Sequence, residues 1–118
     1  LNFGHTVGHA IEAACGYGKY HHGEAVALGM RAACRMSVAA KFLPARDALR
    51  IEMLLSRIGL PQQFKGANLA KVLRVMKFDK KFSGAKNRFV LARRIGRATV
   101  VEGLPPGFVA AIVRGLQG

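Results

Sequence analysis

The most constraining feature of this sequence is an apolar segment, residues 23–42, that is rich in Ala, Met, Leu and Val and carries few charges before Arg31. A helix that is apolar on all sides has to be buried. This segment is therefore predicted to be a central helix, ended by Pro44, around which the other elements pack. With 118 residues, of which 51% are hydrophobic, the chain has room for one modest domain and enough apolar side chains for its core.

The remaining segments predict a mainly α domain with a short β element late in the chain. One segment carries helix formers ahead of two glycines, two have apolar residues at helical spacing, and the last opens with a Pro-Pro pair, which a helix start tolerates. Two segments rich in β-branched and apolar residues, each closed by a glycine, predict strands. The predicted helices are residues 6–14, 46–58, 68–78 and 108–116, and the predicted strands are residues 88–96 and 97–103.

Two of these helices carry more specific predictions. The helix over residues 46–58 is predicted to be amphipathic and packed at the surface. Its apolar residues at mostly helical spacing are Leu49, Ile51, Leu54, Leu55 and Ile58. In the helix over residues 68–78, Asn68 is expected to be the N-cap.

The chain starts at Leu1 rather than at a methionine, and its densest motif begins at the second residue. We therefore interpret residues 1–118 as a single domain from the later portion of a longer protein. A site built on His5 and His9 is then expected to draw further groups from upstream sequence.

The chain is strongly basic, with 19 Lys and Arg residues against 6 Asp and Glu residues and a formal net charge of +13. Ten of the basic residues fall between Lys71 and Arg97, where Asp79 is the sole acid. Such a charge attracts nucleic acid, phosphate esters or an acidic partner domain, but it is equally typical of a solvated basic face. No recognised nucleic-acid motif accompanies it, so nucleic acid is not the expected partner.

Cys15 and Cys34 have no short metal-binding spacing, and both lie in apolar helical stretches. They are predicted to be buried free thiols, which are typical of a reducing cytoplasm. No uninterrupted apolar run reaches the length of about 18 residues that a membrane span needs, and no signal-peptide pattern is present. The sequence therefore predicts a cytoplasmic protein with no membrane partner.

All four histidines of the chain lie within its first 22 residues. On a helix, His5 and His9 are four residues apart and so share one face, with Glu12 close to it. Two imidazoles at this spacing can bind zinc, or one can bind a metal while the other moves protons. Metalloprotease helices need a glutamate directly after the first histidine, and Thr6 occupies that position here, so peptidase chemistry is not supported.

Glycines accompany these histidines. Gly4, Gly8 and Gly23 stand beside the key imidazoles, although a glycine costs a helix roughly 1 kcal/mol. Two explanations stay open at this stage. Either a ligand approaches the backbone closely, or another helix packs against it.

The motifs LNFGHTVGHAIEA and HGEAVALGM closely resemble the signature of the 3-dehydroquinate synthase family. An RIGLP segment, the segment FDKKFSGAKNRFVL and the final IGRATVVEG follow in the family's order. The resemblance covers nearly all of the chain as the α-helical C-terminal domain of that enzyme. It implies conversion of 3-deoxy-D-arabino-heptulosonate 7-phosphate to 3-dehydroquinate and phosphate in the shikimate pathway, with bound NAD and a divalent metal, Zn²⁺ or Co²⁺.

The resemblance also implies roles for individual residues. His5 and His22 match the family's metal-ligating histidines, and a third ligand, a glutamate, belongs to the N-terminal portion. His9 matches the histidine assigned to proton transfer. Asn2 and Lys80 match substrate contacts, with Lys81 as the neighbouring alternative. The position before the HGE histidine is commonly apolar in the family but is His21 here, and His22 is chosen because Gly-Glu follows it. Glu24 could orient a ligand or interact with the helix dipole.

The remaining expectations concern the whole enzyme. No glycine-rich dinucleotide fingerprint occurs in this chain, so NAD is expected to be held by a missing N-terminal domain, and no cofactor-binding residue is assigned here. The family implies a homodimer and a small phosphorylated sugar acid as substrate. The chain alone is predicted to be inactive and to bind metal weakly. The alternatives are a related sugar-phosphate cyclase and, from another class, a basic nucleic-acid-binding module.

Overall fold

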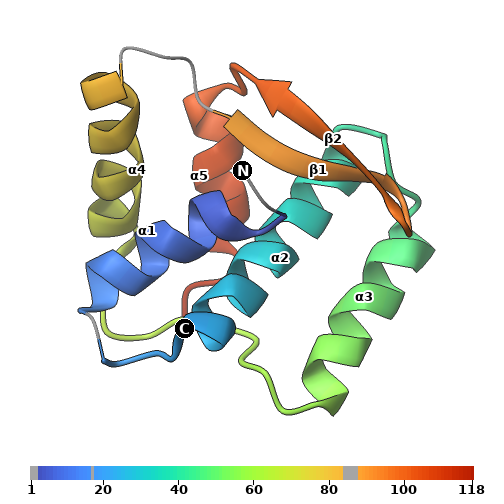
Figure 1. The fold of residues 1–118 in the computed structure, drawn as a ribbon, viewed down its shortest axis with the longest axis horizontal. Helices are drawn as coiled ribbons and strands as arrows, with labels where there is room; N and C mark the ends of the chain where they lie inside the picture. The colour runs from blue at the N-terminus through green and yellow to red at the C-terminus, as the bar shows by residue number, and fades with distance from the viewer. Residues whose placement is uncertain (1–2, 17, 84–87) are drawn as a thin grey trace.

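A computed structural model describes residues 3–16, 18–83 and 88–118, with the backbone alone described for residues 77–83. The described residues form five helices and a two-stranded sheet, which confirms the predicted mainly α fold with a short late β element (Figure 1). The helices are α1 (His5–Cys15), α2 (His22–Ala39), α3 (Ala45–Arg57), α4 (Leu69–Ser83) and α5 (Pro106–Arg114), and the strands are β1 (Arg88–Arg94) and β2 (Arg97–Glu102).

Helix α2 is the central helix, as predicted from its composition. It packs against α1, α3, α5 and β1, and in Figure 1 it lies with α1 between α3 and α4. The residues that α2 buries are mostly small, with Leu28, Met36 and the ion-paired Arg31 as the large members. Small side chains let neighbouring helices approach closely, so the composition of this segment explains both its burial and the tight packing around it.

The predicted end of α2 is wrong, because the helix stops at Ala39 rather than continuing to residue 42. The Phe42 N–H donates to the Ser37 carbonyl at 2.9 Å, and the Lys41 N–H donates to the Val38 carbonyl at 2.9 Å. These two bonds form a Schellman motif, in which Lys41 takes the left-handed conformation with φ of 64°. Pro44 instead stands at the N-cap of α3.

Replacing Lys41 with glycine is expected to stabilise the chain by about 0.5–1 kcal/mol, because a lysine at positive φ carries a steric cost that glycine avoids. Chemical denaturation of the two proteins measures the difference. Ala40→Gly is the matched control, since Ala40 has an ordinary φ of −81° and gains nothing from glycine. Equal or lower stability of Lys41→Gly would contradict the prediction.

Helix α3 begins and ends within one residue of its prediction, but its apolar residues are less buried than the pattern indicated. Leu55 is buried, whereas Leu49 and Leu54 are each 59% exposed and Ile58 is 63% exposed. The reason is that α3 packs mainly against α2, and ion pairs rather than apolar side chains make part of that contact. Glu52 pairs with Arg31 at 3.3 Å and with Arg35 at 3.0 Å across that contact.

Helix α4 starts as predicted but runs to Ser83, five residues beyond the predicted end at residue 78. The Asn68 side chain accepts a hydrogen bond from the Lys71 N–H at 2.8 Å, which confirms the N-cap. The extension has a plain cause, because Asp79, Lys80 and Lys81 are compatible with a helix and the first glycine after them is Gly84.

The two predicted strands and the predicted last helix are confirmed, and the strands form a hairpin. Strands β1 and β2 pair antiparallel around a turn at Gly96, whose φ is 88°. Phe89 and Leu91 of β1 are buried in the core. The Ala92 N–H donates to the Ser37 hydroxyl at 2.9 Å and so ties β1 to α2. Helix α5 begins and ends two residues earlier than predicted, with Pro106 in its first turn.

The two cysteines differ in burial. Cys34 is fully buried, and desolvation raises the pKa of its thiol to about 12. Cys15 is only half-buried and its thiol donates to the Lys65 carbonyl at 3.3 Å, so the prediction that both thiols are buried is wrong for Cys15. Among the residues that the structure describes, no helix is long and apolar enough to cross a membrane.

Candidate metal centre

Helix α1 carries its polar residues on one face and its core residues on the other. His5, His9 and Glu12 follow each other at spacings of four and three residues, which places them on the same side of the helix. The opposite side buries Val7, Ala10, Ile11 and Ala14. Burial of that apolar side leaves His5 half-buried and His9 exposed at the surface of the domain.

Three glycines allow α1 and α2 to cross at backbone contact. A Cβ on Gly29 would lie 1.8 Å from the Gly4 carbonyl oxygen, and a Cβ on Gly8 would lie 2.9 Å from the Ala25 carbonyl oxygen. Helix packing is therefore the explanation for Gly4 and Gly8 that the sequence left open. Gly23 differs, because nothing among the described residues lies within 4 Å of a Cβ built there.

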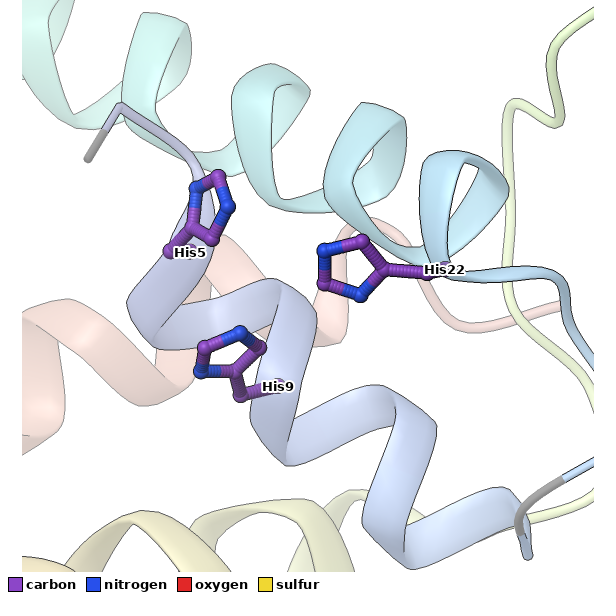
Figure 2. Close-up of side chains that lie close together, drawn as sticks. All are labelled: His5, His9 and His22. Carbon is purple, nitrogen blue, oxygen red and sulfur yellow. The ribbon is translucent and has the colours of Figure 1, made fainter.

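This crossing places His22, the first residue of α2, beside the histidine face of α1. Figure 2 shows the rings of His5, His9 and His22 around one space between the two helices. One nitrogen from each ring lies within 4.8 Å of the others. The ring centroids are 5.2 Å apart for His5 and His9, 5.6 Å for His5 and His22, and 5.7 Å for His9 and His22.

The three imidazoles differ in the hydrogen-bond partner of the Nδ1 nitrogen. His22 Nδ1 lies 3.2 Å from Glu12 Oε1, and His5 Nδ1 lies 3.4 Å from the Phe3 carbonyl oxygen. His9 has ring contacts with both histidines but no hydrogen-bond partner within the described ranges. Metal-ligating histidines almost always donate their other ring N–H to such an acceptor, and a ring without one is free to exchange a proton.

His21 and Glu24 belong to the helix start rather than to this cluster. Glu24 Oε1 accepts a hydrogen bond from the His21 N–H at 2.9 Å, which is the reciprocal half of a capping box. This bond fixes Glu24 in the first turn of α2, where a carboxylate also interacts favourably with the helix dipole. The cluster contains His22 and not His21, within the part of the chain that the structure describes.

The other predicted site residues lie outside the described side chains. Asn2 lies outside the described residues, and Lys80 and Lys81 lie where the backbone of α4 is described but their side chains are not. Sequence reasoning missed Tyr20, whose hydroxyl accepts from the Lys65 N–H at 2.7 Å and anchors the loop just before His22. A tyrosine between glycines and a histidine pair gave no signal for that bond, because its partner is 45 residues away.

The donor set fits a divalent metal of the zinc type. Zinc binds imidazole nitrogen at about 2.0–2.1 Å, so two nitrogens in a tetrahedral site lie about 3.4 Å apart. Nitrogens already within 4.8 Å of one another need only small side-chain rotations to reach that spacing. His9 and His22 are exposed, which leaves the cluster open to a further ligand from outside this chain.

Comparison with known proteins gives consistent matches. The family model described as 3-dehydroquinate synthase C-terminal matches residues 1–82. The 3-dehydroquinate synthase of Acidithiobacillus ferrooxidans (strain ATCC 53993 / BNL-5-31) is 45% identical over 117 residues, which are 99% of this chain and 31% of that protein. The 3-dehydroquinate synthase of Gloeobacter violaceus is 43% identical over 120 residues, covering 100% of this chain and 33% of that protein.

Solved structures share the fold. A 2-deoxy-scyllo-inosose synthase complexed with carbaglucose-6-phosphate, NAD⁺ and Co²⁺ matches 95% of this chain and 32% of its own with a TM-score of 0.82 at 24% identity. A 2-epi-5-epi-valiolone synthase from Streptomyces hygroscopicus with NAD⁺ and Zn²⁺ bound matches 97% of this chain and 31% of its own with a TM-score of 0.84 at 21% identity. The chain thus spans about a third of the length of the relatives it matches.

Proposed function

We propose that this chain, which belongs to the 3-dehydroquinate synthase family, is the metal-binding C-terminal domain of that enzyme. One observation carries the proposal. Nitrogens of His5, His9 and His22, from two helices, lie within 4.8 Å of one another at an accessible surface. Histidines from separate elements meeting in this way form a donor set for a divalent metal rather than a helix cap.

The activity that we propose for the full enzyme is conversion of 3-deoxy-D-arabino-heptulosonate 7-phosphate to 3-dehydroquinate and phosphate. NAD and a divalent metal, Zn²⁺ or Co²⁺, are its proposed cofactors. The chain contains no Gly-x-Gly-x-x-Gly segment, so its residues do not fit an NAD fingerprint site, and a separate N-terminal domain is proposed to hold NAD. This chain alone is then inactive.

His5 and His22 are the proposed metal ligands, and an upstream glutamate is the proposed third. A metal bound there supplies Lewis-acid polarisation of substrate hydroxyls. The hydrogen bonds of His5 and His22 through Nδ1 support these roles, because they hold each ring in place and leave Nε2 available. His9 is the proposed proton-transfer group, and its freedom from a hydrogen-bond partner among the described residues supports that role.

Asn2 and Lys80 are proposed to contact the substrate. Asn2 precedes His5 by three residues, and Lys80 lies on α4, which packs against α1. In that role Lys80 would supply a mobile point charge for the substrate carboxylate or phosphate. The homodimer and the cytoplasmic location of the full enzyme stay predictions.

The proposal is tested by titrating the 118-residue chain with Zn²⁺. The wild-type chain is expected to bind one ion weakly, because a ligand is missing. His5→Ala and His22→Ala are each expected to lower Zn²⁺ affinity by more than about 100-fold. Removing even a hydrogen-bond partner of a ligand typically lowers metal affinity about 10–100-fold, so removing the ligand itself should cost more. A chelator competition assay measures the affinities.

His21→Ala is the matched control, because His21 adjoins His22 in sequence but lies outside the cluster. Its affinity for Zn²⁺ should stay close to that of the wild-type chain. Equal affinity of all four proteins would overturn the proposed metal site. Chelator-insensitive binding to mixed DNA that falls steeply with salt would instead favour the nucleic-acid alternative.

A further inference from the structure

We propose that Glu12 is a positioning residue that fixes the tautomer and orientation of His22, an inference that rests on the metal site proposed above. The carboxylate of Glu12 comes from the middle of α1, while His22 begins α2. Glu12 Oε1 and His22 Nδ1 are 3.2 Å apart. The contact therefore links the two helices at the place where their histidines meet.

Chemistry dictates the direction of this hydrogen bond. An ionised carboxylate can only accept, so His22 Nδ1 must carry the proton when the bond is made. The neutral ring then has its free electron pair on Nε2, which is the nitrogen left for a metal. Glu12 in this way selects one of the two tautomers of His22, and it also restricts rotation of the ring.

The burial of the two groups suits this role. The side chain of Glu12 is 18% exposed, whereas that of His22 is 59% exposed. The more buried carboxylate is held by its helix, and the more exposed imidazole needs a partner to stay in one orientation. Without Glu12, the His22 ring would keep only its contacts with the other two rings and would lose more conformational entropy on binding a metal.

Glu12 is distinctive among the acidic residues whose side chains the structure describes. In a chain with 19 Lys and Arg residues, Asp47, Glu52 and Glu102 each pair with arginine, while Glu24 accepts from the His21 backbone. Within the same described set, Glu12 has no Lys or Arg partner and instead meets a histidine. Its placement is therefore specific to the cluster rather than a consequence of the basic surroundings.

The test compares Glu12→Ala and Glu12→Gln in the 118-residue chain at one fixed pH near 8. Glu12→Ala is expected to lower Zn²⁺ affinity by about 10–100-fold, the usual effect of removing such a partner. Glu12→Gln keeps an acceptor oxygen of the same shape, so its affinity should lie between those of Glu12→Ala and the wild-type chain. Glu102→Ala, which removes an equal charge from β2, should bind like wild type.

A second readout needs no metal. Nitrogen chemical shifts of His22 in the metal-free chain report which ring nitrogen carries the proton. The wild-type chain should favour Nδ1–H, Glu12→Gln should retain part of that preference, and Glu12→Ala should lose it. A change in folding alone would not move the tautomer of one ring while circular dichroism stays constant.

Three results would overturn the inference. If Glu12→Ala bound Zn²⁺ with wild-type affinity, Glu12 would have no positioning role, although the proposed metal site would stand. Equal and severe loss in Glu12→Gln, Glu12→Ala and His22→Ala would make Glu12 a ligand in its own right. An unchanged His22 tautomer in Glu12→Ala would also contradict it. Failure of the wild-type chain to bind Zn²⁺ would count against the proposed function instead, and the tautomer measurement would still decide the contact.

Discussion

Replacing His9 with alanine in the full-length enzyme is expected to lower kcat by about 10²–10⁴-fold, the usual contribution of a positioned acid or base. Zn²⁺ content should stay close to that of the wild-type enzyme. The reason is that the hydrogen bonds of His5 to the Phe3 carbonyl and of His22 to Glu12 do not involve His9. Phosphate release measures kcat, and elemental analysis measures bound zinc.

His22→Ala in the same enzyme is the control that distinguishes loss of catalysis from loss of the metal. That variant should lose both activity and zinc, whereas His9→Ala should lose activity alone. If His9→Ala also lost its zinc, all three imidazoles of the cluster would be ligands, and proton transfer would need another group. Full activity in His9→Ala would remove its catalytic role.

Much of the fold could be predicted because the decisive signals are local. The apolar composition of residues 23–42 indicated a buried helix, and Asn68, Gly96 and Pro106 mark a cap, a turn and a helix start by their own conformational preferences. The errors arose where local preference was overridden. Lys41 ends α2 in a conformation that usually selects glycine, which no lysine signals in advance.

The site was predictable along each helix but not between helices. Spacing alone placed His5 and His9 on one face of α1. The family resemblance, and not the pattern, added His22 from the next helix. The bond between Glu12 and His22 could not be predicted, because it depends on how closely α1 and α2 approach, and that approach is set by backbone contacts at three glycines.

Those glycines make the crossing a sensitive point of the structure, and Gly29 is its tightest contact. A Cβ there would lie 1.8 Å from the Gly4 carbonyl oxygen and 2.7 Å from the Gly8 backbone nitrogen. Both neighbours are backbone atoms on α1 or at its N-cap, so no side-chain rotation can relieve the overlap. The helices would have to separate, and the core residues Val7 and Ile11 of α1 would move with them.

Two effects of known size therefore act in opposite directions on the stability of Gly29→Ala. Alanine is favoured over glycine inside a helix by about 1 kcal/mol, whereas forcing extra volume into a packed contact costs typically about 1–3 kcal/mol, and more where backbone must move. Because the overlap is with backbone, we expect the packing cost to win and the chain to lose at least about 2 kcal/mol of unfolding free energy. Urea denaturation measures this loss.

Gly107→Ala provides the matched control, because Gly107 is also helical, in α5, but a Cβ there meets nothing within 4 Å among the described residues. That substitution should be neutral or stabilise the chain by up to about 1 kcal/mol through helix propensity alone. A Gly29→Ala chain as stable as the Gly107→Ala chain would show that α1 and α2 do not cross at backbone contact. The shared space of His5, His9 and His22 depends on that crossing, so Gly29→Ala should also weaken Zn²⁺ binding in whatever fraction of the chain still folds.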